Sequence, residues 1–218
     1  CLNVSGQLVI RSCSIINNVG IGVLLSGVNS IIHNTVIDNN SGVGVRILST
    51  SLDMKGCIVS NNEASPGANG GGFYIENVIG EDLVEIKTTI IENNTSTTGH
   101  GGGIYNTNAV TNLILSTVQN NSANNDYGGG IYAVGGGQGE MRIIESNIRG
   151  NTADQGGGIA AEGYLYVSKS QIVDNSASAD CGGIRICCGM EAEIYNSTIA
   201  NNSSGSDSGN GITLTGEN

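Results

Sequence analysis

Residues 12–23 read SCSIINNVGIGV, and this stretch is one copy of a pattern that recurs along the whole chain. A small residue is followed by an aliphatic residue, an asparagine, and then a glycine that leads into another aliphatic residue. The pattern (Ser/Thr/Cys)-x-(Ile/Val)-x-x-Asn ends at eight asparagines: Asn18, Asn40, Asn62, Asn94, Asn121, Asn151, Asn175 and Asn202.

The spacing of these asparagines predicts the architecture. They follow one another at intervals of 22 to 32 residues, and apolar residues alternate with polar ones between them. Such a repeat indicates a solenoid, in which each copy buries its apolar face only against its neighbours. Period-two alternation and poor helix propensity favour strands. We therefore expect an all-β, right-handed parallel β-helix of about eight coils with three short strands each.

In the first coil, Leu8 and Ile10 are expected to point inward, Arg11 and Ser12 to form a bend, and Cys13 to point inward again. The repeated asparagine that ends the coil's second strand has a physical role. Asparagine tolerates the left-handed conformation of a sharp turn, and its amide can hydrogen-bond the asparagines one coil above and below. We expect an internal asparagine ladder, with a similar column of Ser, Thr and Cys at the bend.

Glycine runs mark the re-entry into each coil. Gly70–Gly72, Gly101–Gly103, Gly128–Gly130 and Gly156–Gly158 precede Phe73, Ile104, Ile131 and Ile159. Glycine there permits positive φ angles and close backbone approach. A phosphate-binding loop would require a helix N-terminus and usually a lysine, and the sequence offers neither.

Composition and charge exclude several partners. The 218 residues carry a net charge of −11, with only eight basic residues. A nucleic-acid partner needs clustered Lys and Arg, so none is expected. No apolar run approaches the roughly 20 residues of a membrane span, so this segment is not expected to insert into a membrane. We expect a single β-helix domain over residues 1–218, as a segment of a longer solenoid.

The six cysteines do not define a disulfide framework. Cys13 and Cys57 occupy the same repeat position two coils apart, about 9–10 Å at ~4.8 Å per coil, which is too far for a bridge. Both are interpreted as small buried residues. If residues 181–187 are extended, Cys181 cannot reach Cys187 either. The pairing of Cys1, Cys181, Cys187 and Cys188 is left open.

The paired signatures (Ile/Val)-x-x-Asn and Gly-Gly-(Ile/Phe)-(Tyr/Ala) resemble the repeats of the polymorphic outer membrane protein family, which includes chlamydial surface proteins. In that family the repeats carry Phe-x-x-Asn and Gly-Gly-Ala-Ile. Here Ile37, Val118 and Ile172 take the Phe position, and Gly mostly replaces Ala. The resemblance implies an extracellular or cell-surface, adhesin-like passenger segment. Its partner would be a protein or glycan of a host or neighbouring cell.

Right-handed β-helices also include polysaccharide lyases and hydrolases, and this alternative can be tested against the residues. Gly99-His100-Gly101 and Arg185-Ile186 are fragments of a polygalacturonase-like pattern, but Cys187 stands where lysine would be needed and no Asp-Asp pair occurs. Glycoside hydrolysis needs two carboxylates in one cleft. No catalytic constellation and no metal site are predicted, and His100 is interpreted as a chance residue of a polar loop.

Two surface columns remain as candidates. Tyr74, Tyr105 and Tyr132 each follow an inward residue and should face outward on three successive coils, continued by Ala160, Arg185 and Thr213. A tyrosine column could bind sugar rings or a protein; the alternative is packing that shields the sheet.

The second column is acidic: Asp126, Asp154, Asp180 and Asp207 precede re-entry glycines. It is either a solvated edge or a place where structural calcium would relieve charge repulsion. No other cofactor is expected. Open strand edges at the ends of a β-helix also invite end-to-end self-association into a filament.

Overall fold

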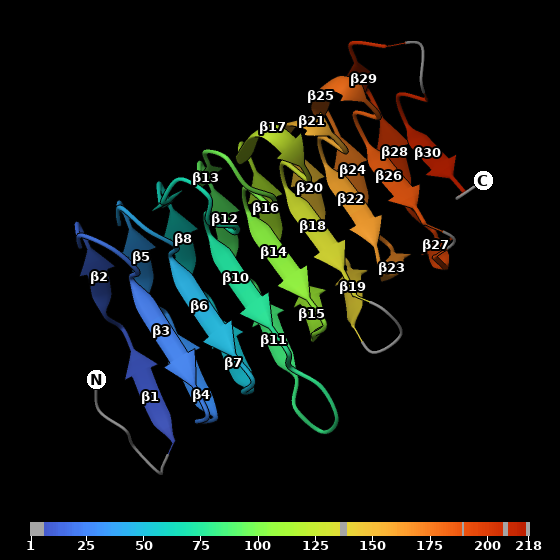
Figure 1. Cartoon of the computed structure of the whole chain (residues 1–218). Coiled ribbons are helices and arrows are strands. Elements are labelled where there is room, and N and C mark those ends of the chain that lie inside the picture. Colours follow the sequence, from blue (N-terminus) through green and yellow to red (C-terminus); the bar gives the residue numbers. More distant parts are fainter. Residues whose placement is uncertain (1–6, 136–138, 189, 207–208, 217–218) are drawn as a thin grey trace.

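The computed structural model describes residues 7–135, 139–188, 190–206 and 209–216. Cys1 and Asp207, named above, lie outside these residues. The chain winds as a parallel β-helix, and its coils follow one another along a single axis from the N-terminal to the C-terminal end (Figure 1). Among the described residues, none forms a helix with the length and apolarity needed to cross a lipid bilayer.

Three sheets of eight strands and one of six account for the strands of the described chain. Sheet A contains β1 (Leu8–Arg11), β4 (Ser30–His33), β7 (Leu52–Lys55), β11 (Val84–Lys87), β15 (Val110–Ile114), β19 (Glu140–Ile144), β23 (Tyr164–Ser168) and β27 (Ala192–Tyr195). Sheet B contains β2 (Ser14–Ile16), β5 (Val36–Asp38), β8 (Ile58–Ser60), β12 (Ile90–Glu92), β16 (Thr117–Gln119), β20 (Asn147–Arg149), β24 (Gln171–Val173) and β28 (Thr198–Ala200).

Sheet C contains β3 (Val23–Ser26), β6 (Val45–Leu48), β10 (Phe73–Glu76), β14 (Ile104–Thr107), β18 (Ile131–Val134), β22 (Ile159–Glu162), β26 (Ile184–Cys187) and β30 (Ile212–Thr215). Sheet D contains β9 (Glu63–Ala64), β13 (Thr95–Ser96), β17 (Ser122–Tyr127), β21 (Thr152–Gln155), β25 (Ser176–Asp180) and β29 (Ser203–Ser204). The predicted parallel β-helix with three short strands per coil is confirmed. Sheet D was not predicted, because its two- to six-residue strands lie in the polar segments that follow six of the eight ladder asparagines, from Asn62 onward.

The core is a set of aliphatic columns that run up the inside of the solenoid. On sheet A, Ile32 pairs in register with Met54, and Met54 with Ile86, and all three are fully buried. Phe73 is the largest of the fully buried side chains. Each sheet therefore buries its inner face within the coil, which replaces the helices that usually cover parallel sheets.

The asparagine ladder is present, and its interior amides are hydrogen-bonded at both the oxygen and the nitrogen. Asn94 Nδ2 donates to Asn121 Oδ1 at 3.0 Å and to the Val59 carbonyl at 2.9 Å, while Asn94 Oδ1 accepts from the backbone N and Nδ2 of Asn62. Amide-to-amide bonds of 2.8–3.0 Å link all seven consecutive pairs from Asn18 to Asn202. Fully paired buried amides fix the register between coils.

The ladder asparagines do not adopt the left-handed conformation, and that expectation was wrong. Positive φ belongs to the residue just before each of them, as in Asn17 (58°), Asn93 (55°) and Gly150 (64°). Positive φ and the ladder hydrogen bonds belong to different residues, because the turn residue faces solvent whereas the ladder residue must point inward. An asparagine, glycine or aspartate makes the turn, and the asparagine that follows it makes the ladder bonds.

The column of small residues at the bend is also confirmed. Thr89 N donates to Ser116 Oγ and Ser116 N to Ser146 Oγ, each at 3.1 Å. Cys57 is buried as predicted, but Cys13 is exposed. Cys13 belongs to the first described coil, and residues 1–6, which precede that coil, lie outside the described chain.

The re-entry glycines serve both expected purposes. Gly128 has a φ of 69°, and a Cβ added to Gly130 would lie 2.6 Å from the carbonyl oxygen of Gly158 in the next coil. In the seventh coil Cys181 replaces the first glycine and holds a φ of 51°.

Replacing a ladder amide should strongly destabilise the fold. Asn121→Ala leaves buried donors of Asn94 and the carbonyl of Ile91 unpaired, and it should lower the free energy of unfolding by about 3 kcal/mol. Urea denaturation followed by circular dichroism measures this. The adjacent turn residue is the control: Asn120→Gly, at an exposed site with φ 54°, should change stability by less than about 1 kcal/mol. Equal losses in both variants would contradict the division of roles.

Because neighbouring coils approach closely at the re-entry glycines, we expect the cost of replacing a glycine with alanine to depend on its position in the stack. Gly130→Ala should lower the free energy of unfolding by about 3 kcal/mol, because its methyl group meets backbone. Gly211 holds the same repeat position in the last described coil, where an added Cβ would meet only the Ile199 side chain at 3.7 Å. Gly211→Ala should cost about 0.5 kcal/mol or less. Thermal melting of the two variants compares them; similar losses would refute the steric explanation.

Candidate functional site

The three candidate tyrosines lie in one column on the outer face of sheet C. Tyr74 pairs in register with Tyr105, and Tyr105 with Tyr132. Their ring centroids are 5.2 Å and 5.7 Å apart, within the range of attractive aromatic pairs. The column continues to Ala160, Arg185 and Thr213, as the repeat pattern predicts.

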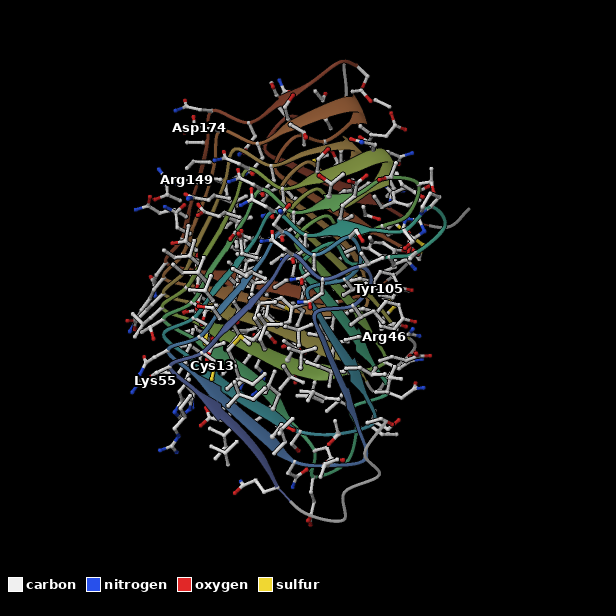
Figure 2. The ribbon with its side chains drawn as sticks, turned by 90° about the vertical axis from the view of Figure 1, so that its left-hand side faces the viewer. Cys13, Arg46, Lys55, Tyr105, Arg149 and Asp174 are labelled. Atoms are coloured by element: carbon white, nitrogen blue, oxygen red, sulfur yellow. A yellow bond between two sulfur atoms is a disulfide. The ribbon has the colours of Figure 1, made fainter. Side chains whose placement is uncertain are left out.

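The N-terminal part of the column is open. The guanidinium of Arg46 lies 4.9 Å from the centre of the Tyr74 ring, and the Tyr74 hydroxyl donates to Glu76 at 3.1 Å. Tyr74 and Tyr105 are half-buried, so one face or edge of each ring reaches solvent. Figure 2 shows Arg46 and Tyr105 together on one side of the coil, across from Lys55 of sheet A. We call Arg46, Tyr74, Glu76 and Tyr105 the open tyrosine surface.

Tyr132 differs from the other two, because it is only 5% exposed. The ring of His100 lies 4.7 Å from that of Tyr132, and Tyr127, at the end of β17, lies 5.8 Å from it. Both covering residues come from the segments that precede a re-entry glycine. All three tyrosines therefore lie in the predicted outward column, but His100 and Tyr127 cover the third.

His100 lies in the loop between β13 and β14, next to the glycine run as expected, and its side chain packs against aromatic and acidic residues there. Its ring stacks on Tyr127 at 5.2 Å, and its Nδ1 lies 2.7 Å from Asp126 Oδ1, an ion-pair distance without hydrogen-bond alignment. From two coils further on, the guanidinium of Arg185 lies 5.2 Å from the centre of the same Tyr127 ring. We call His100, Asp126, Tyr127, Tyr132 and Arg185 the closed cluster.

Arg185 connects the closed cluster to two further carboxylates. Its Nε donates to Asp180 at 3.2 Å, and its Nη1 lies 3.7 Å from Glu162. The Arg185 side chain is 13% exposed, so this charge is largely desolvated and depends on its acidic partners. The sequence could not show this assembly, because loop length and the register shifts in sheet D decide which residues of distant coils meet.

Burial and nearby carboxylates both raise the pKa values of the three tyrosine hydroxyls. Burial, assisted by the hydrogen bond to Glu76, raises the pKa of Tyr74 to about 12. Burial also raises the pKa of Tyr105, and burial together with Glu162 raises the pKa of Tyr132. All three hydroxyls are therefore neutral at physiological pH, and that of Tyr74 donates to Glu76.

The acidic column does not bring its carboxylates together. Asp126 lies beside His100, Asp154 accepts a hydrogen bond from the Ser178 hydroxyl, and Asp180 pairs with Arg185. Each of these three carboxylates therefore has a hydrogen-bonding or charged partner of its own. Within the described ranges, Asp126, Asp154 and Asp180 do not form a group of three ligand atoms close enough for one ion.

Glu162, Cys187 and Cys188 do form such a group, with ligand atoms within 4.8 Å of one another. The two cysteines are joined in a disulfide between adjacent residues, so their sulfurs are not available as thiolate ligands in this state. Cys181 is a buried free thiol, in line with the expectation that it cannot reach Cys187. Burial raises the pKa of Cys181, which makes it a weak nucleophile.

Comparison with known proteins supports the right-handed β-helix fold and does not assign a function. A family model described as a right-handed β-helix region matches residues 1–79, just over a third of the chain. No curated protein and no solved structure matches the chain. The coils of the described residues continue the same parallel winding beyond residue 79, so the whole solenoid is a right-handed parallel β-helix.

The raised tyrosine pKa values predict a late alkaline titration. An exposed tyrosine ionises near pH 10, whereas Tyr74 should ionise near pH 12. Folding therefore favours the protonated phenol, and this contribution to stability is complete below pH 10 and is lost as pH rises toward 12. Tyrosinate absorbance in the folded protein should rise later than in urea-unfolded protein. Tyr74→Phe should remove part of the late-titrating absorbance; identical curves in the two states would contradict the burial of these rings.

Proposed function

We propose that this chain is a non-catalytic, extracellular or cell-surface β-helix segment that binds a protein or glycan partner through the open tyrosine surface. The observation that carries the proposal is the stacked pair of half-buried tyrosines flanked by Arg46. Tyrosine and arginine are the residues most often found at the energetic centres of interfaces. They also provide a flat apolar face with hydrogen-bonding groups at its edge.

Rigidity supports a binding role. The rings project from a sheet whose register is fixed by seven amide-to-amide bonds between coils, so little conformational freedom is lost when a partner binds. Stacking at 5.2 Å and the cation–π contact of Arg46 hold the side chains as well. A partner would meet a surface that is already arranged.

The surface location and the adhesin-like role rest on the repeats. Their (Ile/Val)-x-x-Asn and Gly-Gly-(Ile/Phe) elements resemble those of polymorphic outer membrane proteins, and the finer membership in that family is part of this proposal. The low content of basic residues argues against a nucleic-acid or anionic-membrane partner.

One observation favours a second candidate, a polysaccharide lyase or hydrolase. His100, Asp126 and Arg185 converge in the closed cluster, with Glu162 and Asp180 beside them. Titratable groups gathered on one face are a common feature of active sites. Against catalysis, His100 and Arg185 are each paired with an acidic partner, and Tyr132 beneath them is covered.

Removing the open rings should abolish binding without unfolding the protein. In Tyr74→Ala/Tyr105→Ala, attachment to cells and to arrayed glycans should fall by about tenfold or more, because the aromatic anchors of an interface are lost. Tyr132 is left intact, since truncating a buried tyrosine would create a cavity. Leu24→Ala is the matched control: Leu24 lies in the same column, on β3, and is 51% exposed.

Attachment that is unchanged in the double variant, or reduced equally by Leu24→Ala, would refute the proposed surface. The same glycans can be assayed for depolymerisation. Release of products that disappears in His100→Ala would favour the enzyme over the binding segment.

A further inference from the structure

A second aromatic surface lies on sheet A, away from the open tyrosine surface. Outward positions of β19 and β23 line a depression of about 340 Å³, formed by Glu140, Arg142, Ile144, Tyr164 and Tyr166. The strands place these residues in register, Glu140 beside Tyr164 and Arg142 beside Tyr166. The sequence signal is the alternation Tyr164-Leu165-Tyr166-Val167, which sends both tyrosines to the outer face.

The next coil adds a carboxylate that fixes two of the rings. Glu193, in register with Tyr166, accepts hydrogen bonds of 2.9 Å from the hydroxyls of Tyr164 and Tyr195. The Tyr166 ring lies 5.9 Å from the Tyr195 ring, with a tilt of 48° between them. Tyr164 and Tyr195 are therefore held by hydrogen bonds at their hydroxyls, and Tyr166 is held by its contact with the Tyr195 ring.

The depression also holds hydrogen-bonding groups that are still free. Arg142 Nε pairs with Glu140 Oε1 at 2.8 Å, and the Arg142 side chain is 46% exposed. Among the described residues, no hydrogen bond or ion pair uses the two terminal amino groups of Arg142 or the hydroxyl of Tyr166. Free, planar donors beside a fixed aromatic ring can bind a ligand that has both an apolar face and several hydroxyls.

The charged residues around the depression indicate which class of ligand it can bind. Glu140 and Glu193 contribute two negative charges against the single positive charge of Arg142, and the whole chain carries −11. Uronates, sulfated sugars and phosphates would be repelled, whereas a neutral sugar ring would not. The volume of the depression, about 340 Å³, lies at the low end of the range for ligand pockets, roughly 300–1,000 Å³.

We propose that this depression, the sheet A pocket, binds a neutral hexose unit of an oligosaccharide. The C–H face of the sugar stacks on Tyr166, and adjacent hydroxyls bond to Arg142 and Glu140. The inference does not depend on the open tyrosine surface, because the two lie on different sheets and share no residue.

Calorimetry and saturation-transfer NMR with neutral oligosaccharides of glucose, mannose and galactose, and with oligogalacturonate as the charged control, test the proposal. At least one neutral oligosaccharide should bind, with saturation transferred to its ring C–H protons. Tyr166→Ala and Arg142→Ala should each raise its Kd by about tenfold, the weight of one good contact. Tyr166→Phe keeps the ring and should change Kd by less than about threefold.

Tyr105→Ala, on the other sheet, should leave this Kd unchanged, and circular dichroism should show every variant folded, since Arg142 and Tyr166 lie outside the core. The proposal is overturned if the unmodified chain binds none of the neutral oligosaccharides, or if it prefers oligogalacturonate. It is also overturned if Tyr166→Ala and Arg142→Ala leave Kd unchanged.

Discussion

The vertical hydrogen bonds between ladder asparagines are the constraint on which this molecule depends. Each interior amide, such as that of Asn94, accepts two bonds from the asparagine of one neighbouring coil and donates one to the asparagine of the other and one to a backbone carbonyl. A buried amide that lost its partner would cost about 1–3 kcal/mol, so a slip in register is penalised at every coil. The ladder therefore fixes the register between neighbouring coils once in every coil. The spacing from one ladder asparagine to the next can then vary from 22 to 32 residues without disturbing the stack.

Because the register of the core residues is fixed, the side chains on the outer face of the sheets are aligned as well. Because Phe73, Ile104 and Ile131 are in line in the core, the residues that follow them are in line on the surface. Neighbouring parallel strands lie about 4.8 Å apart, close to the separation that aromatic rings prefer when they stack. The same mechanism operates on sheet A, where Arg142, Tyr166 and Glu193 share a column. A parallel β-helix thus turns a repeat in sequence into a row of side chains at a spacing suited to flat ligands.

The features that could be predicted from sequence are those that repeat. Asn94 and Asn121 have the same neighbours in sequence and in space, so one explanation serves every coil. The division between turn and ladder asparagines was missed because Asn93-Asn94 presents two identical residues. Gly150-Asn151 contains the clue, since glycine at the first position marks where positive φ is required. The closed cluster could not be predicted, because His100 and Arg185 lie in different coils and are brought to the same Tyr127 ring only by the irregular path of sheet D.

The contrast along the tyrosine column shows how one fold can produce both an open and a covered surface. Tyr74 and Tyr105 differ from Tyr132 only in what lies beside them, since all three hold the same repeat position. Beside Tyr132, the six-residue strand β17 ends in Tyr127, which together with His100 covers the ring. The covering residues, one at the end of a sheet D strand and one in a loop, both lie outside the apolar core and the asparagine ladder. The segments between a ladder asparagine and the next re-entry glycine can therefore open or close a binding surface, while the amide ladder keeps the column in place.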